Sequence, residues 1–315
     1  MQALPAPLPD RDGVSPSYIW IPEIAPLPLH QFLAQQFPDV PASIWQERLA
    51  KQEVVTQTGE KLQADSIVRR GMCIFYYREV PAEPRIPFEE QILFQDEHLL
   101  VADKPHFLPV TPGGQYLRET LLVRLKQRTG LSQLTPLHRL DRETAGVILF
   151  SVNPATRGKY QAMFQAKTMQ KTYHAVARHL PALETPCTRR SRITESPRFF
   201  VMEETAGEPN SETHLRVLRH EGEWALYELS PVTGKRHQLR VHMNALGCPI
   251  LHDTFYPTAL PAGSDDFAKP LQLLAKTIRF TDPLSGDVRE FHSDQQLFLP
   301  QQNAENTATI DINPL

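Results

Sequence analysis

This sequence has few cysteines, no long hydrophobic run and no excess of positive charge. Its three cysteines, Cys73, Cys187 and Cys248, are widely spaced along 315 residues and form no paired motif. Neither a disulfide framework nor a thiolate metal site is therefore indicated, and a reducing cytoplasm fits the sequence. No stretch is long enough to span a membrane, and no basic segment followed by an apolar core opens the chain. We therefore expect no membrane segment and no secretory signal.

The charge balance gives no general sign of nucleic-acid binding. The formal net charge is −3, whereas proteins that bind nucleic acid usually carry a basic excess. Positive charge can still be concentrated in one cleft, where it acts locally. With 41% hydrophobic and 22% charged residues, the composition is that of a soluble globular protein. At this length, two domains are the natural expectation.

The distribution of proline predicts five segments. Residues 1–26 form a proline-rich extension, residues 27–80 a small domain, and residues 81–87 a proline-containing linker. Residues 88–300 form the main domain, and residues 301–315 form a polar tail.

The small domain is expected to contain two helices followed by a hairpin. Apolar residues recur at helical spacing between positions 29 and 37. Ser43–Gln46 has the spacing of a capping box and should start a second helix that ends near Lys51. Short strands are expected at residues 54–55 and 74–76. Across residues 27–80 six acidic side chains balance six basic ones, so a strongly basic face is not expected.

The main domain is organised around thirteen residues, His138–Phe150. Asp141 lies in a charged turn just before Ala145-Gly146 and a run of four large apolar residues, which predicts a fully buried strand. A loop held at the mouth of a rigid strand is a usual place for a catalytic group. Arg139 and Arg142, on either side of Asp141, should keep its carboxylate ionised. An ionised carboxylate suits a nucleophile or a base.

Other stretches of the main domain predict regular elements. A helix is expected at residues 120–128, and Asn153-Pro154 should begin another that runs to about Gln165. Lys171–Val176 alternates as a strand. Further strands are expected at residues 223–229, 271–275 and 278–280.

A further helix is expected to begin near His237 and to end at Gly247. In it Leu239, Met243 and Leu246 form one apolar face, whereas His237 and Arg240 share another. One buried face would thus anchor the helix while Arg240 points toward a cleft.

Residues 181–213 are polar and are interpreted as irregular, with a basic cluster at Arg189, Arg190, Arg192 and Arg198. A solvated loop is the default interpretation. A loop that contacts phosphates is the functional alternative.

Taken together, four ordered stretches resemble the RluA-type RNA pseudouridine synthases. His138–Gly146 resembles the signature His-Arg-Leu-Asp-x-x-Thr-Ser-Gly, and Asp96–Pro105 resembles the family's opening strand and Asp-Lys-Pro turn. Lys171–Ala175 matches Lys-x-Tyr-x-Ala. Thr233–His242 resembles Thr-Gly-Arg-x-His-Gln-Ile/Leu-Arg-x-His, and Gly247–Asp253 resembles the turn that follows it. The chain departs from these patterns where it has Ala145 for Ser, Lys235 for Arg and His252 for Gly.

The resemblance covers most of residues 88–295 and implies a fold and a reaction. The fold would be mixed α/β (α+β), with a largely antiparallel sheet, flanking helices and a catalytic cleft, preceded by a small diverged domain similar to that of ribosomal protein S-four. The reaction would be the isomerisation of uridine to pseudouridine in structured RNA, either ribosomal or transfer RNA. No metal and no organic cofactor are implied, and we expect a monomer that acts in the cytoplasm.

The resemblance also implies roles for individual residues. Asp141 would be the catalytic carboxylate, Arg240 its ion-pair partner, and Tyr173 the ring that stacks on the target base. Whether the carboxylate attacks the sugar or removes a ribose proton is left open. The residues expected to bind substrate are His138, Arg139, Arg142, Lys171, Lys235, Arg236 and His237. Among them, Arg139 would fill the space left by a flipped base, and His138 would be a structural hydrogen-bonding group.

Two other functions were weighed. The first is a metal-dependent hydrolase, for which the candidate ligands are His138, Asp141, His237, His242, His252 and Asp253. No metal-binding spacing supports it, since neither H-x-x-x-H nor H-E-x-x-H occurs among these residues. The second is a catalytically silent RNA-binding or ribosome-assembly factor with the same fold. The small domain, likewise, could bind RNA or could be a structural cap.

Overall fold

The structure is a computed structural model that describes residues 6–80, 82–198, 200–261 and 265–300. The chain divides into two units, one formed by Met1–Arg85 with Thr111–Ser132 and the other by Ile86–Val110 with Gln133–Leu315. The polar tail expected at residues 301–315 lies outside the described residues. Within the described part, no helix is long and apolar enough to cross a membrane.

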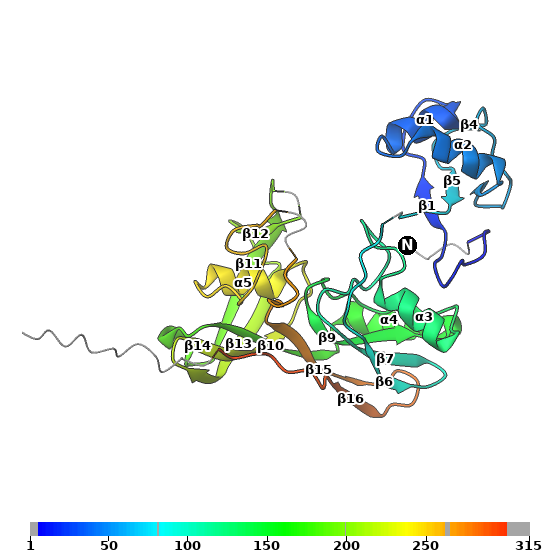
Figure 1. The fold of residues 1–315 in the computed structure, drawn as a ribbon. Helices are drawn as coiled ribbons and strands as arrows, with labels where there is room; N and C mark the ends of the chain where they lie inside the picture. The colour runs from blue at the N-terminus through cyan, green and yellow to red at the C-terminus, as the bar shows by residue number, and fades with distance from the viewer. Residues whose placement is uncertain (1–5, 81, 199, 262–264, 301–315) are drawn as a thin grey trace, which may run out of the picture. The chain divides into compact units, whose positions relative to one another are not determined.

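The first unit packs helices on one face of a small antiparallel sheet (Figure 1). Its elements are β1 (Ser17–Trp20), β2 (Leu27–Pro28), α1 (Leu29–Gln36), α2 (Ala42–Ala50), β3 (Val54–Thr56), β4 (Ile67–Val68), β5 (Cys73–Tyr76) and α3 (Leu121–Thr129). The sheet has the order β1-β5-β3. Leu33, Trp45 and Ile74 belong to the core between α1, α2 and the sheet.

Both predicted helices of the small domain are confirmed, but the prediction of a capping box at Ser43–Gln46 is wrong. The helix α2 begins at Ala42, and its N-cap is Pro41, which has no side-chain cap. The extended backbone of Pro41 already sets the entry to the helix, and its carbonyl accepts a hydrogen bond from Ile44 N at 3.0 Å. Ser43 therefore lies inside the first turn, where it cannot serve as N-cap.

The second unit is built on one large sheet with helices α4 (Pro154–Ala166) and α5 (Gln238–Ala245). Its strands are β6 (Gln91–Gln95), β7 (Leu99–Lys104), β8 (Thr135–Pro136), β9 (Ala145–Ser151), β10 (Gln170–Arg178), β11 (Cys187–Glu195), β12 (Met202–Thr205), β13 (Ser211–Glu221), β14 (Trp224–Pro231), β15 (Leu273–Thr281) and β16 (Val288–His292), with a short 3-10 helix at Pro181–Leu183. The order along the sheet is β12-β11-β13-β14-β10-β15-β9-β7-β6. Every pairing is antiparallel except that of β15 with β9. The expected α+β fold with a largely antiparallel sheet is confirmed.

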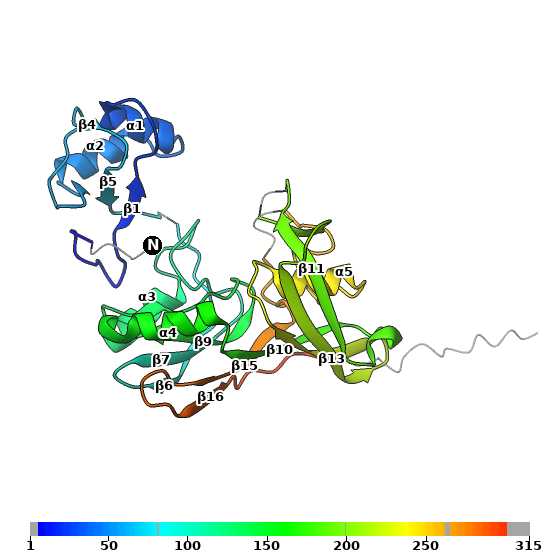
Figure 2. The same cartoon turned by 180° about the vertical axis from the view of Figure 1, so that it is seen from behind.

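The two helices of this unit cover different parts of the sheet. Figures 1 and 2 show α4 over β7 and β9, and α5 beside β10 and β11. Tyr160 and Met163 of α4 pack with Val147 of β9, whereas Leu239 and Met243 of α5 pack in a separate core cluster with β10 and β14. The two helices thus pack into separate core clusters on the sheet.

The strand β9 is fully buried, as its apolar run predicted. Gly146, its second residue, has φ +112° and lies directly opposite Ala275 of β15. A Cβ atom at position 146 would stand 2.2 Å from the carbonyl oxygen of Ala275. Only glycine allows this backbone conformation and this close approach of two strands. Gly146 therefore fixes the point at which the chain passes from the Asp141 loop into the core.

The expectation that residues 181–213 are irregular is wrong, because about half of them form β11, β12 and the start of β13. Arg189 Nε donates to Glu204 at 3.1 Å, and Arg190 Nε donates to Glu212 at 2.9 Å. Both pairs join neighbouring strands, where opposite charges stabilise the ladder. Since side chains on both faces are largely polar, the hydrophobic alternation that usually marks a strand is absent here.

We predict that Gly146→Ala lowers the free energy of unfolding of the second unit by more than about 3 kcal/mol, because β9 and β15 must separate to admit the methyl group. Gly158→Ala in α4 is the matched control, since nothing lies within 4 Å of its Cβ position. In a helix this second change should stabilise by up to about 1 kcal/mol. The free energies of unfolding of both variants are measured by denaturant unfolding. Equal changes in the two variants would contradict the conclusion that position 146 requires glycine.

Candidate active site

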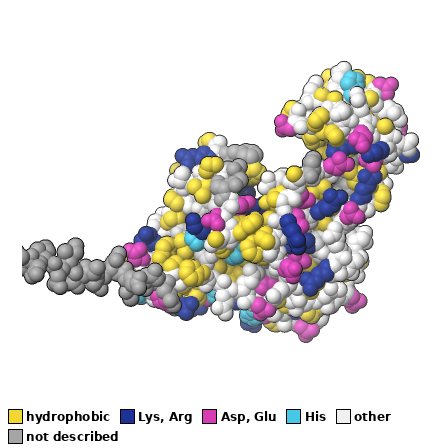
Figure 3. All heavy atoms as spheres, viewed as in Figure 1, with side chains coloured by type: hydrophobic (Ala, Val, Ile, Leu, Met, Phe, Trp, Pro, Cys, Tyr) yellow, Lys and Arg dark blue, Asp and Glu magenta, His cyan; other side chains and the backbone are white. Residues whose placement is uncertain are grey.

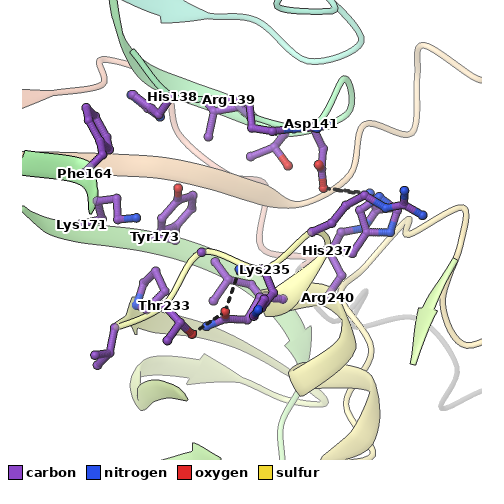
Figure 4. A pocket seen from close by; sticks show the side chains of 18 of the residues that line it. His138, Arg139, Asp141, Phe164, Lys171, Tyr173, Thr233, Lys235, His237 and Arg240 are labelled. Atoms are coloured by element: carbon purple, nitrogen blue, oxygen red, sulfur yellow. Dashed lines mark hydrogen bonds and ion pairs between the residues drawn. The ribbon is translucent and has the colours of Figure 1, made fainter. Parts of the chain in front are cut away.

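A cleft opens in the second unit above β10. Its volume of about 590 Å³ is within the usual range of ligand sites. Figure 4 shows Asp141 on one wall and Tyr173 and Lys171 on another. Its lining residues are Leu137–Asp141, Thr144, Phe164, Lys167, Met169, Lys171, Tyr173, Pro231–Arg240 and Leu273. The three residues predicted to be catalytic thus line a single cleft.

Asp141 lies in the loop that leads into β9, and its side chain is 18% exposed. The loop is held from behind by Lys104, whose ammonium donates to the carbonyl oxygens of Pro105, Leu108 and Arg142 at 3.0, 2.8 and 2.9 Å. Burial lowers the pKa of Lys104 to about 7, although the charges of Glu143 and Asp141 oppose this shift. Lys104 was not among the site residues predicted from the sequence. The Asp-Lys-Pro turn was the signal that could have marked it.

Arg240 is buried beneath the floor of the cleft, with its side chain 1% exposed. Its Nε and Nη2 donate to the two carboxylate oxygens of Asp253 at 2.8 and 2.6 Å. Its Nη1 lies 3.4 Å from Asp141 Oδ2 and 3.5 Å from Glu143 Oε2. One guanidinium therefore serves three carboxylates, of which Asp253 is the closest and Asp141 is the one that reaches the cleft.

The surroundings of Arg240 keep it charged. Burial alone would lower the pKa of this guanidinium, but the hydrogen bonds and charge of Asp253, with Asp141 and Glu143, leave it raised. The rings of Phe255 and Tyr256 lie 4.9 and 5.7 Å from the guanidinium carbon. Aromatic faces at this distance add to the stabilisation of a buried cation.

His237 completes this end of the cleft. Its Nε2 lies 3.8 Å from Asp141 Oδ2, and its ring stacks on Phe255 at 5.3 Å. Burial lowers the pKa of His237, and the charge of Asp141 offsets only part of this effect. The imidazole is therefore neutral at pH 7, so Arg240 is the permanent cation beside Asp141.

Tyr173 faces the cleft from β10, at the point where the pairing of β10 with β15 shifts register between Thr172 and Tyr173. Such bulges re-aim side chains and are common beside active sites. Burial and the charge of Asp141 raise the pKa of Tyr173, so its hydroxyl stays protonated. The side chain therefore offers a flat ring with a neutral polar tip.

The positive charge that the whole chain lacks is concentrated in this cleft. Besides the single carboxylate of Asp141, six cationic side chains line it, namely Arg139, Lys167, Lys171, Lys235, Arg236 and Arg240. On the face drawn in Figure 3, by contrast, Lys and Arg are mixed with Asp and Glu. Lys167 was missed by the sequence reasoning. It ends α4 with φ +55°, a local conformation that the sequence did not indicate.

Three other arginines were predicted to bind substrate, and two of them, Arg139 and Arg236, line the cleft. Arg139 is exposed at the rim, and no hydrogen bond or ion pair of its side chain occurs among the described residues. Arg142 does not line the cleft, because its guanidinium donates to both oxygens of Asp265 at 2.7 and 2.6 Å. Arg236 lines it and lies 3.6 Å from Glu195.

His138 and Gln238 hold the cleft walls. The Nε2 atom of His138 accepts from Leu149 N at 3.1 Å, and burial lowers the pKa of His138 to about 3, so the ring is neutral. Gln238 was given no role by the sequence. Its Oε1 accepts from Thr233 Oγ1 at 2.6 Å and Lys235 N at 3.1 Å, which fixes the loop that carries Lys235.

Comparison with known proteins identifies the family of this chain. The family model of RNA pseudouridylate synthases matches residues 98–245. Ribosomal large subunit pseudouridine synthase C of Vibrio cholerae is 31% identical over 288 residues, which cover 87% of this chain and 91% of the relative. The dual-specificity RNA pseudouridine synthase RluA of Haemophilus influenzae is also 31% identical, over 68% of this chain and 94% of the relative. This chain belongs to the RluA-type RNA pseudouridine synthases.

A solved structure supports the same assignment. Human RNA pseudouridylate synthase domain containing 1 superposes with a TM-score of 0.56 at 26% identity, over 68% of this chain and 86% of the human chain. Members of this family are isomerases that convert uridine in RNA to pseudouridine. Cationic side chains such as those that line the cleft are the groups that contact nucleic-acid phosphates.

The candidate ligands of a metal-dependent hydrolase do not converge in this synthase. His242 is buried among hydroxyl groups, with Thr213 Oγ1 at 2.9 Å and Ser211 Oγ at 3.0 Å, and burial lowers its pKa to about 4. Within the described residues, the one cluster with metal-ligand spacing is His179, Glu184 and His220, none of which lines the cleft. Its two imidazoles stack in parallel at 4.1 Å, so their lone pairs do not converge on a common point.

His252, the residue that replaces the family's glycine, has φ +62°. This left-handed backbone conformation favours glycine, which explains the family pattern at this position. The side chain has one contact, from Nδ1 to the carbonyl of Pro270 at 3.3 Å. The departure therefore affects the backbone just before Asp253, and no role in substrate contact follows from it.

We predict that Arg240→Met destabilises the synthase by about 3–5 kcal/mol, because Asp253 would be left buried and unpaired. Adding Asp253→Asn should restore most of this stability. The double variant should still form no pseudouridine, since Asp141 would lack its cation. Unfolding curves and pseudouridine assays of both variants are the measurement.

Arg289→Met is the matched control. Arg289 Nε donates to the buried carboxylate of Asp282 at 2.7 Å, and neither residue lines the cleft. This variant should lose stability but keep the wild-type rate at a temperature where it is folded. A double variant of Arg240 and Asp253 that is fully active would show that Arg240 only supports the fold.

Proposed function

We propose that this synthase isomerises specific uridines of a structured RNA, either ribosomal or transfer RNA, to pseudouridine. Its relatives support both substrate classes. One is named a ribosomal large subunit pseudouridine synthase, another is named dual-specificity, and a yeast mitochondrial relative is named tRNA pseudouridine(32) synthase. The single observation that carries the proposal is the cleft itself, which among the described residues is lined by one carboxylate, six cations and a tyrosine.

In the proposed site, Asp141 is the catalytic carboxylate. Arg240 lies 3.4 Å away, and the attraction between the two charges becomes stronger when the bound RNA excludes water. An ionised carboxylate at this position can attack the sugar as a nucleophile or remove a ribose proton as a base. Both routes require the same geometry, with the ribose at the Asp141 end of the cleft.

Tyr173 is proposed to hold the uracil while its bond to the sugar is broken. The target base must leave the RNA stack to reach the cleft, at a cost of roughly a few kcal/mol. A protonated tyrosine can stack on the base and also donate a hydrogen bond to it. Arg139 is exposed at the rim, and its long side chain is proposed to fill the space that the flipped base leaves.

The remaining cations are proposed to contact the RNA backbone. Lys235 and Arg236 belong to the loop before α5 that Gln238 fixes, and Lys167 follows the C-terminal end of α4. All three residues line the cleft. The paired guanidinium of Arg142 is proposed to support the Asp141 loop through Asp265 and Glu143, and to touch RNA only if these pairs open. Residues 27–80, which lie within the first unit, are proposed to be the S-four-like domain, and the synthase is proposed to act as a monomer without metal.

Transcriptome-wide mapping of pseudouridine in cells that carry either the wild type or Asp141→Ala tests the proposal. One or a few uridines should lose modification with Asp141→Ala, because no other carboxylate lines the cleft in the described structure. Asp287→Ala, which removes an exposed carboxylate on a distant turn, should leave the map unchanged. If Asp141→Ala is expressed and folded and the map is also unchanged, the silent RNA-binding factor becomes the better interpretation.

A further inference from the structure

Lys171 is the one buried or half-buried lysine of the second unit, within the described residues, whose ammonium has no partner atom. It enters the cleft from β10, two residues before Tyr173. Its Nζ lies 4.0 Å from the position of a Cβ atom on Gly234, so the side chain reaches across to the opposite loop. In Figure 4 its amine lies next to the Tyr173 ring, at the end of the cleft away from Arg240.

The other buried cations of the second unit are compensated, which makes Lys171 unusual. Lys104 donates to three carbonyl oxygens, and Arg240 meets three carboxylates. Burial lowers the pKa of Lys171, and no neighbouring carboxylate offsets this effect. A desolvated ammonium without a counter-charge is costly to the free protein. An anion that forms beside it during the reaction would be stabilised more strongly than it would be in water.

The reaction itself generates such an anion. When the bond between ribose C1′ and uracil N1 breaks, its electron pair leaves with the uracil. This holds whether Asp141 attacks C1′ or takes a ribose proton. The detached uracil then carries one negative charge, spread over its ring and two carbonyl oxygens. It rejoins C1′ through C5 as Asp141 either leaves C1′ or returns the ribose proton. C5 then loses its proton and N1 gains one, so that uridine and pseudouridine are isomers and no co-reactant is needed.

We propose that Lys171 is the cation that stabilises the detached uracil anion by contacting one of its carbonyl oxygens. This inference rests on the proposed function, in which Tyr173 stacks on the same base. It divides the cleft into two charged ends. Arg240 serves the Asp141 carboxylate at the ribose end, and Lys171 serves the leaving group at the base end, where the described structure offers no other cation beside Tyr173.

A leaving-group comparison tests this role. Fluorine at C5 withdraws electrons and makes the uracil anion more stable, so 5-fluorouridine needs less help to leave. Single-turnover rates with saturating enzyme are measured on one RNA that carries either uridine or 5-fluorouridine at the target position. The readout is the loss of the N1-linked nucleoside after digestion, because C5 of the fluorinated base has no proton to lose.

Lys171→Met should slow the uridine reaction on the order of 10²-fold, as the loss of one stabilising donor does elsewhere. With 5-fluorouridine the loss should be smaller by about tenfold or more. Lys171→Arg should recover much of the rate, because it restores the charge. Lys235→Met is the matched control, since it removes another cleft lysine, and its loss should be the same for both bases and should appear mainly in RNA affinity.

The outcomes separate this inference from the proposed function. Equal losses with both bases, or a loss of affinity alone, would overturn the role of Lys171 while the wild type remained active and Asp141→Ala inactive. If the wild type released neither base, or if Asp141→Ala were as fast as the wild type, the proposed function itself would fail. An unfolding curve is measured first to show that the Lys171→Met variant is folded.

Discussion

One buried guanidinium, that of Arg240, is the interaction on which the site depends. Burying an isolated charge costs much free energy. Arg240 can therefore lie under the cleft only because it forms a bidentate ion pair with Asp253. Asp141 and Glu143 then share its remaining side. The loop before β9 is thereby brought to the helix α5 and the turn at Asp253, although Asp141 and Arg240 are 99 positions apart in sequence. The guanidinium that pairs with Asp253 thus also lies 3.4 Å from Asp141, the carboxylate proposed to be catalytic.

The second constraint is the placement of charge. The chain is acidic overall, yet the cleft has six cations against one carboxylate. These cations come from the ends of α4 and α5, from β10 and from the Asp141 loop, so their proximity is a property of the fold alone. Elsewhere in the second unit arginines are neutralised across strands, as Arg189 is by Glu204. Net charge was therefore a poor guide to the partner, whereas local potential in the cleft is a good one.

Local signals in the sequence predicted the elements that local physics determines. Asn153 caps α4 as expected, and the apolar run after Gly146 is a buried strand. One local prediction failed, because Pro41 and not Ser43 is the N-cap of α2. The partners of the site residues could not be predicted because they depend on distant contacts. No pattern in the sequence shows that Asp253 is the main partner of Arg240, or that Arg142 is neutralised by a residue more than a hundred positions away. The resemblance to a family supplied the candidate residues, and the structure supplied the partners that decide which of them are free to meet RNA.

The central claim is that an ionised Asp141, held by Arg240, performs the chemistry in a cleft that binds RNA through its other residues. Asp141→Asn tests it most directly, because it keeps the shape of the side chain and removes its charge. With purified protein and an RNA that contains the target uridine, single-turnover pseudouridine formation and RNA affinity are measured together. The account predicts that formation is abolished while affinity is retained or increased, since a negative charge leaves a cationic cleft. A variant that forms pseudouridine within a few-fold of the wild-type rate would contradict it.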